Sequence, residues 1–375
     1  MIIIIILLGI LALYFLQRLL YTKLWNNGLD IRIEFEDKAN YEGEMSSMTE
    51  TVTNRNFLPL PFLHAKFEVG AGLDFQDKEN LKTSDKNYKN DIFAILFYQR
   101  IRRRLPFVCK KRGYYYIERA NLQGTDLFYS ALLLQDYPQN VGFYVYPKRL
   151  DISSLDQPLR KMIGEVTCRT FLYPDPFEFK GLRDYTISDP MKTINWKASA
   201  KTGNLMVNLY DSTTTRRIVI LLDFEDDLLV RHFPLYEESI RLAAAIASKM
   251  LAEGFPVKII SNGFDCQTKE PMPDLFARGV AEAEDISRLL SRIDLNQKSP
   301  EFAPVIRKQT EDPDFRSAGY ILITPCMKKN VQESMVRLSE EASCLYITPL
   351  YRNIPSKLSL PSSVEEIRWE VAGYA

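Results

Sequence analysis

The chain opens on an uninterrupted apolar run. Residues 1–16 read MIIIIILLGILALYFL and carry no charged or amide side chain. A membrane-spanning helix needs about 20 mostly apolar residues. The run reaches that length if Gln17 and Arg18 are tolerated near its end, because arginine can extend its charge to the headgroups. Tyr21 and Trp25 follow where interfacial aromatic side chains belong. We therefore predict a transmembrane anchor over residues 1–24.

The alternative for this segment is a cleaved signal peptide. Such a peptide needs a basic start and a cleavage site of small residues, and neither is present. Arg18 and Lys23 follow the apolar run, and the positive-inside rule then places the body of the protein in the cytoplasm. We expect a single-pass protein of the cell membrane with a cytoplasmic body.

Residues 25–150 show strand-like alternation. Apolar and polar residues alternate over Ile31–Glu36 and again over Ala65–Val69, and aromatic runs occur at Tyr114–Glu118 and Gly142–Tyr146. Short alternating segments separated by turns predict a small antiparallel β-sandwich. The polar stretch 74–90 is expected to be a hairpin tip or a loop.

The last third alternates between buried strands and helices. Ile218–Leu222 is a continuous aliphatic run, as in a buried parallel strand, and residues 236–250 keep helical spacing. Further strands are expected at 257–260, 320–323 and 345–347, and further helices at 285–293 and 331–342. This order predicts a doubly wound α/β domain over residues 211–375. The fold class is therefore α+β multidomain, with residues 151–210 as a connector.

Composition narrows the function classes. With 375 residues the chain is long enough for about two to three folded units. The 48 basic and 48 acidic residues balance, so we expect no nucleic-acid partner. Five cysteines without a CxxC pair exclude a disulfide framework and a zinc ribbon, and they suit a reducing compartment. Two histidines exclude a histidine-rich metal site.

A basic cluster lies within the predicted sandwich. Arg102, Arg103 and Arg104 are consecutive and have aromatic neighbours. They form either a solvated strand face or a contact with anionic lipid beneath the anchor. The solvated face is the favoured interpretation, because runs of charge are usually solvated.

Residues 181–203 form an unusual segment. Asp189 and Pro190 suit a helix start, and Gly203 suits a left-handed helix end, so a short helix is predicted over 190–201. Polar and aromatic side chains surround it. They form either a partner-binding site, since such residue types are common hot spots, or an internal staple between domains. The candidates are Arg183, Tyr185, Asp189, Trp196, Lys197 and Lys201.

This segment resembles the signature of the domain-of-unknown-function 58 family, roughly G-L-R-x-Y-x-x-G-D-x-x-R-x-I-x-W-K-x-S-A-R. Weaker likenesses lie upstream, at Lys111–Tyr114, Asp126–Phe128 and Tyr146–Pro147. The resemblance implies a von Willebrand factor A-like domain at the C-terminal end. It also implies work with a MoxR-type AAA+ ATPase in the chaperone-like maturation of other proteins. The matching positions of the signature are Gly181, Leu182, Arg183, Tyr185, Asp189, Ile194, Trp196, Lys197, Ser199 and Ala200.

The family resemblance also implies a metal motif, D-x-S-x-S, after the first strand of that domain. Here Asp223 is kept, but Glu225 and Asp227 replace both serines. Ligands bind beyond the carboxyl ends of parallel strands, which is where Asp223 is expected. Three alternate carboxylates suit Mg²⁺ or Ca²⁺, yet they also suit a degenerate solvated loop. A bound metal is thus an alternative, and no cofactor is expected to be required.

Two classes of function remain. The first is a non-enzymatic, membrane-anchored interaction or scaffold protein that works with the AAA+ ATPase. The second is a metal-dependent hydrolase or a metal-dependent ligand-binding protein that uses the acidic loop at Asp223. No P-loop, G-x-G-x-x-G, G-x-S-x-G or H-E-x-x-H motif occurs. We therefore expect the first class and assign no catalytic residue.

Overall fold

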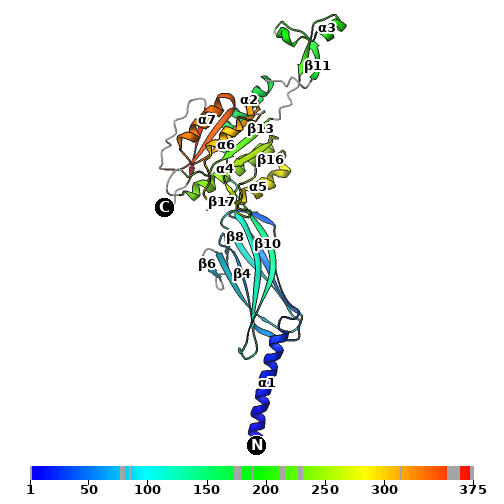
Figure 1. Ribbon diagram of the computed structural model, residues 1–375, viewed down its shortest axis with the longest axis vertical. Helices are drawn as coiled ribbons and strands as arrows, with labels where there is room; N and C mark the ends of the chain where they lie inside the picture. The colour runs from blue at the N-terminus through cyan, green and yellow to red at the C-terminus, as the bar shows by residue number, and fades with distance from the viewer. Residues whose placement is uncertain are drawn as a thin grey trace. The chain divides into compact units, whose positions relative to one another are not determined.

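The computed structural model describes residues 2–76, 81–83, 86–172, 179–187, 189–210, 216–226, 231–312, 315–352 and 364–371. The chain forms two compact units, Met1–Lys148 and Arg149–Ala375 (Figure 1). Each unit has its own hydrophobic core.

The first unit begins with helix α1 (Ile2–Leu24). Its 23 residues span about 34 Å, slightly more than the hydrocarbon thickness of a bilayer. The most apolar part of this helix is fully unburied, and the helix is long and apolar enough to cross a membrane. The predicted anchor is therefore a helix of suitable length and composition, and its orientation stays a prediction.

The rest of this unit consists of two facing β-sheets that share one core. The first sheet has the order β1-β3-β8-β5 and the second β2-β10-β9-β4-β7-β6. Neighbouring strands run antiparallel, except that β2 pairs parallel with β10. The strands are β1 (Leu29–Phe35), β2 (Ala39–Tyr41), β3 (Met45–Asn54), β4 (Leu60–Gly70), β5 (Leu73–Phe75), β6 (Leu81–Thr83), β7 (Lys86–Ile95), β8 (Arg100–Cys109), β9 (Gly113–Thr125) and β10 (Leu132–Tyr146).

Of the two expectations for 74–90, a hairpin tip or a loop, the loop is wrong: the stretch contains β6 and the start of β7, which pair antiparallel as a hairpin. The pattern was hidden because the inward positions of β7 include charged residues. Lys89 and Asp91 are both buried, and their side chains approach to 3.5 Å. Arg103 reaches the same carboxylate at 3.1 Å. A strand whose interior positions pair charges has no apolar alternation to reveal it.

Glu50 completes this buried charge cluster. It lies on β3 directly opposite Arg103 of β8, and its side chain is fully buried. Burial, and then the neighbouring Asp91 carboxylate, raise the pKa of Glu50 to about 8. A buried carboxyl that stays protonated near neutral pH avoids the cost of an uncompensated charge.

A side chain connects the two sheets at strand β1. β10 contains an irregularity between Pro138 and Val141, and Gln139 lies inside it. The Ile33 N–H donates to Oε1 of Gln139 (2.8 Å), and Nε2 of Gln139 donates to the carbonyl of Ile31 (2.9 Å). This amide thus bonds to the backbone of β1, which is the edge strand of its sheet.

The second unit contains a six-stranded sheet of order β16-β14-β13-β18-β19-β20. Its strands are parallel except β16, which runs antiparallel to β14. A small antiparallel pair, β15 (Phe264–Asp265) and β17 (Ile293–Asp294), accompanies it. The main strands are β13 (Arg217–Leu222), β14 (Val257–Ser261), β16 (Leu275–Ala277), β18 (Ala318–Ile323), β19 (Ser343–Tyr351) and β20 (Glu365–Val371).

Helices cover both faces of this sheet. Ile218, Ile220 and Leu222 of β13 belong to one core cluster, with residues of α2, α4 and α5. Val219 and Leu221 belong to a second cluster, with residues of α6 and α7. The predicted alternation of strands and helices is therefore observed as a mixed α/β unit. The helices are α2 (Asp156–Leu172), α4 (Phe233–Ala252), α5 (Ala283–Ser291), α6 (Ala303–Gln309) and α7 (Lys329–Glu341).

Helix α2 lies in the stretch that the sequence suggested as a connector. Leu155, Leu159 and Met162 are buried in the core with the sheet. The spacing of these three apolar residues in the sequence is that of a helix and could have predicted α2.

The segment 179–210, here called the motif lobe, is a hairpin with a helical insertion. β11 (Phe179–Asp184) pairs antiparallel with β12 (Met206–Tyr210), and between them lie a 3₁₀ turn, η2 (Met191–Thr193), and helix α3 (Trp196–Thr202). The prediction of one helix over 190–201 is wrong at its start, because Asn195 caps α3 with its side chain. Gly203 ends the helix in the left-handed conformation, as predicted (φ 78°).

Candidate functional site

Three parallel strands bring their following residues together at one edge of the sheet. Asp223 follows β13, Asn262 follows β14 and Thr324 follows β18. Nδ2 of Asn262 donates to Oδ1 of Asp223 (2.9 Å), and the Thr324 hydroxyl donates to Oδ2 (2.7 Å). The N–H of Glu225 also donates to Oδ1 (2.7 Å). Asp223 is thus a fully buried hub for three donors.

Glu225 is also buried and also has partners. Its Oε2 accepts from the N–H of Phe302 (2.9 Å), and its Oε1 lies 2.7 Å from the ammonium group of Lys328. Lys328 immediately precedes α7, so this ion pair joins the loop after β13 to the start of that helix.

Burial affects the charge of this cluster. Loss of solvation raises the pKa of Asp223 to about 6, against the opposing effect of the N–H of Glu225 and the Thr324 hydroxyl. The carboxyl group is therefore mostly ionised at pH 7 and becomes mostly protonated below about pH 6. The hydrogen bonds explain why the shift is no larger, since donors stabilise the ionised form.

The residues present do not fit a divalent cation of the type that the resemblance implies. Ligand atoms of Asp223, Glu225 and Cys326 do lie within 4.8 Å of one another. However, Mg²⁺ and Ca²⁺ take oxygen ligands, and one of the three is a thiol. An ammonium group already neutralises Glu225, and a divalent ion bound beside it would meet a like charge. Asp227, the third predicted ligand, lies outside the described residues.

The next acidic residue of the loop is used internally. The Tyr236 hydroxyl donates to Oδ1 of Asp226 (2.8 Å), and Nε of Arg231 donates to Oδ2 (2.9 Å). Arg231 also donates to the backbone carbonyls of Leu295 and Asn296. These bonds tie the acidic loop to a neighbouring loop.

In the motif lobe, Arg183 and Asp189 form a two-pronged ion pair. Nη1 of Arg183 lies 2.6 Å from Oδ2 of Asp189, and Nη2 lies 2.5 Å from Oδ1. Thr186 donates to the same carboxylate through its N–H (2.9 Å) and its hydroxyl (2.8 Å). The Arg183 guanidinium, and then these bonds from Thr186, hold the pKa of Asp189 far below its usual range. Asp189 therefore orders the loop rather than starting a helix.

The other predicted residues of the lobe are placed differently. Tyr185 is half-buried, and its N–H donates to the carbonyl of Leu205 (2.8 Å). Trp196 is 64% exposed on the first turn of α3, and Lys197 and Lys201 are exposed on the same helix. The lobe thus brings together an ordering pair and a separate exposed surface.

The lobe carries other exposed apolar side chains besides Trp196, and sequence reasoning did not select them. Ile187 is 99% exposed and Met191 is 72% exposed. Leu182 and Leu205 are exposed as well. A signal was present, because these positions are apolar in an otherwise polar segment. The lobe therefore exposes several apolar side chains as well as lysines.

The basic cluster is only partly free. Arg103 points into the buried charge cluster, and Arg104 pairs with Glu36 at 2.5 Å. Arg102 is exposed. Arg103 thus lies on the inward face of β8, and Arg102 and Arg104 lie on its outward face. The contact with anionic lipid stays a prediction.

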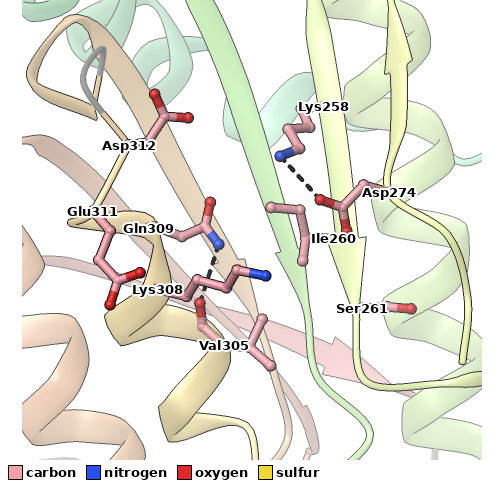
Figure 2. Close-up of a pocket in the computed structure, with 9 residues that line it drawn as sticks. All are labelled: Lys258, Ile260, Ser261, Asp274, Val305, Lys308, Gln309, Glu311 and Asp312. Carbon is pink, nitrogen blue, oxygen red and sulfur yellow. Dashed lines mark hydrogen bonds and ion pairs between the residues drawn. The ribbon is translucent and has the colours of Figure 1, made fainter.

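A cavity of about 400 Å³ lies beside β14 and α6 (Figure 2). Lys258 pairs with Asp274 at 3.0 Å on one side of it, and Lys308 and Glu311 lie on the other. Its charges are mixed, so its chemistry selects no ligand class. Since its walls come from separate segments, no sequence pattern indicated it.

No family model matches the chain, and no curated protein matches it. Parts of it are similar to solved structures. One is the CARDB domain of a Pyrococcus furiosus protein in complex with di-metal ions (12% identity, TM-score 0.22, 32% of this chain and 90% of that chain). A second is AvmM, which catalyses macrocyclization in alchivemycin A biosynthesis (9%, 0.24, 34% and 93%). A third is Spo0M, a sporulation control protein of Bacillus subtilis (10%, 0.19, 42% and 58%). These TM-scores are too low to support any conclusion about function, which has to be inferred from the residues of this chain.

Proposed function

We propose that this protein is a membrane-anchored interaction protein that presents the motif lobe to a protein partner. The observation that carries the proposal is the exposure of Trp196, 64%, on a lobe whose own fold is fixed by internal bonds. Tryptophan is among the commonest anchors of protein interfaces. An exposed tryptophan in a small lobe with further exposed apolar side chains is expected of a docking surface.

The staple alternative is less well supported. A staple between domains would use the Arg183 guanidinium for a bond across a junction. Arg183 instead bonds to Asp189 and to the carbonyl of Asp184, both within the lobe. The lobe's side chains thus separate into those that order it and those that remain free to contact a partner.

Charge indicates the kind of partner surface. Lys192, Lys197 and Lys201 are exposed in the lobe. They would favour an acidic patch around an apolar pocket on the partner. We propose a MoxR-type AAA+ ATPase as this partner, on the resemblance of the signature, with a chaperone-like role in maturing other proteins.

We further propose that the second unit has a doubly wound, von Willebrand factor A-like fold that has lost its metal. The parallel strands, the helices on both faces and the position of Asp223 support this fold. The ion pair between Glu225 and Lys328 supports the loss of the metal. The hydrolase alternative has no comparable support, because Asp223, Glu225 and Asp226 are all held by protein donors.

The test is capture of the partner from gently solubilised membranes. Wild-type protein is expected to retain the ATPase, and Trp196→Ala is expected to lose it. Val280→Ala is the matched control, since that side chain is equally exposed (64%) elsewhere in the same unit. Retention of the ATPase by Trp196→Ala, or its absence from the wild-type capture, would contradict the proposal.

A further inference from the structure

We propose that the aromatic end of the β-sandwich inserts into the boundary between headgroups and acyl chains of the bilayer that α1 spans. This inference rests on the membrane anchor of the proposed function. The inserting surface, here called the collar, consists of aromatic side chains that are 43–72% exposed. Its members are Phe57, Phe62, Phe97, Tyr98, Phe128 and Tyr129.

Three loops and the start of β4 bring the collar together at one end of the first unit. The loops are residues 55–59 after β3, 96–99 after β7 and 126–131 after β9, and Phe62 lies on β4. Nδ2 of Asn54 donates to the carbonyl of Leu96 (3.0 Å), and the N–H of Tyr98 donates to the carbonyl of Asn56 (3.1 Å). The rings of Phe62 and Tyr129 lie 4.8 Å apart. The collar is therefore one connected surface.

Helix α1 leaves the sandwich at this same end (Figure 1). The Tyr21 hydroxyl donates to the carbonyl of Pro59 (2.8 Å), and Nδ2 of Asn56 donates to the carbonyl of Leu24. Further along the helix, Nε2 of Gln17 donates to Oδ2 of Asp126 (2.8 Å). Two of the three loops of the collar thus contact the end of the predicted membrane span.

The positions of these contacts along α1 set the depth of the collar. The ring of Phe128 lies 5.9 Å from the ring of Tyr14. Tyr14 precedes Arg18, the first charged residue of the chain, by about 6 Å of helix. Arg18 has to reach the headgroups. The tip of loop 126–131 then lies on the acyl side of that level.

The composition of loop 126–131 suits a position on the acyl side of the headgroups. Its tip, Leu127–Tyr129, carries no charge. The one carboxylate, Asp126, is fully buried and accepts from Ser130 and from the N–H of Ala131 (3.1 Å) as well as from Gln17. Polar groups that enter a membrane have to be bonded internally. Aromatic side chains are favoured at this depth because their rings suit the boundary.

The test uses full-length protein in neutral phosphatidylcholine vesicles, with lipids brominated near the headgroup or near the chain ends. Bromine quenches tryptophan fluorescence on contact. Phe128→Trp is expected to gain emission that lipids brominated near the headgroup quench. Lys110→Trp is the control. Residue 110 lies between β8 and β9, and loop 126–131 follows the other end of β9. The emission that this added tryptophan contributes is expected to stay unquenched. Because the vesicles contain only neutral lipid, attraction between anionic lipid and Arg102–Arg104 cannot contribute to the binding.

A third variant separates this inference from the anchor. Leu8→Trp places a tryptophan in the middle of the apolar run 1–16. Its emission is expected to be quenched by lipids brominated near the chain ends. Quenching at residue 8 without quenching at residue 128 would overturn the collar alone, and would point to a protein partner on this surface. Absence of quenching at residue 8 would overturn the anchor, and the collar with it.

Discussion

The ammonium group of Lys328 lies 2.7 Å from Oε1 of Glu225. This ion pair places a protein cation at the edge of the sheet where the resemblance implies a divalent metal. The charge of Glu225 is therefore neutralised by the chain itself.

The first prediction concerns metal independence. We expect Mg²⁺ and Ca²⁺ to leave the melting temperature of the wild type unchanged. Lys328→Met should lower stability by about 1–3 kcal/mol, because Glu225 loses its cation while buried. Lys329→Met is the control, since residue 329 is exposed. A metal-induced rise in the wild-type melting temperature that disappears in Asp223→Ala would sink this interpretation.

The second prediction concerns pH and Glu50. Its pKa rises from 4.5 to about 8 on folding, so the folded state keeps a proton that the unfolded state loses. Stability from this group is complete below about pH 4.5, declines as pH rises and is lost above about pH 8. A rise of the pKa from 4.5 to about 8 corresponds to a loss on the order of 5 kcal/mol.

Glu50→Gln should remove this pH dependence. Its amide can still donate toward Asp91, as the protonated carboxyl does, but it cannot ionise. We expect the variant to be more stable than the wild type at pH 8 and little different at pH 5. Thermal melts of the purified protein across this range provide the measurement. Glu34→Gln is the control, because the Glu34 side chain on β1 is exposed. Equal slopes in variant and wild type would show that Glu50 is not the titrating group.

The third prediction separates the two parts of the motif lobe. Trp196→Ala should weaken binding to the ATPase by about 2 kcal/mol or more while leaving the melting temperature unchanged. Arg183→Ala should instead loosen the lobe, because Asp189 loses its two-pronged partner. Limited proteolysis within residues 179–210 reports on that loosening. Protease resistance in Arg183→Ala, or a large loss of stability in Trp196→Ala, would contradict this division.

The fourth prediction concerns Asp126. Asp126→Ala should destabilise the first unit by about 2–3 kcal/mol, because it leaves several buried donors without an acceptor. Gln17→Ala removes only one of those donors and should cost less. A double-mutant cycle of the two changes, followed by thermal melting in detergent, measures their coupling. Strict additivity would show that the helix and the loop are not energetically linked.

The sequence predicted those strands and helices whose buried positions are apolar and regularly spaced. Ile218–Leu222 is buried on both faces and reads as a continuous aliphatic run. Strand β7 was missed because its inward residues Lys89 and Asp91 neutralise each other in the interior. Asp189 resembled a helix cap because the same short acidic side chain serves both a cap and an ion pair.

The candidate site was predictable only in part. The position of Asp223 followed from the end of an aliphatic run. Its partners did not, because Asn262 and Thr324 lie 39 and 101 residues away along the chain. Lys328 was likewise invisible, since a lysine before a helix carries no signal of the carboxylate that it will meet. Only the sheet brings these side chains together.

The amide of Gln139 has a consequence for how copies of this chain meet. An open edge strand offers a row of N–H and C=O groups to any other strand, and this is a common route to aggregation. Here two such groups of β1, at Ile31 and Ile33, are already bonded to a side chain of the same molecule. On a membrane, where anchored copies are concentrated and share one orientation, this occupied edge would keep neighbouring sandwiches from joining into a continuous sheet.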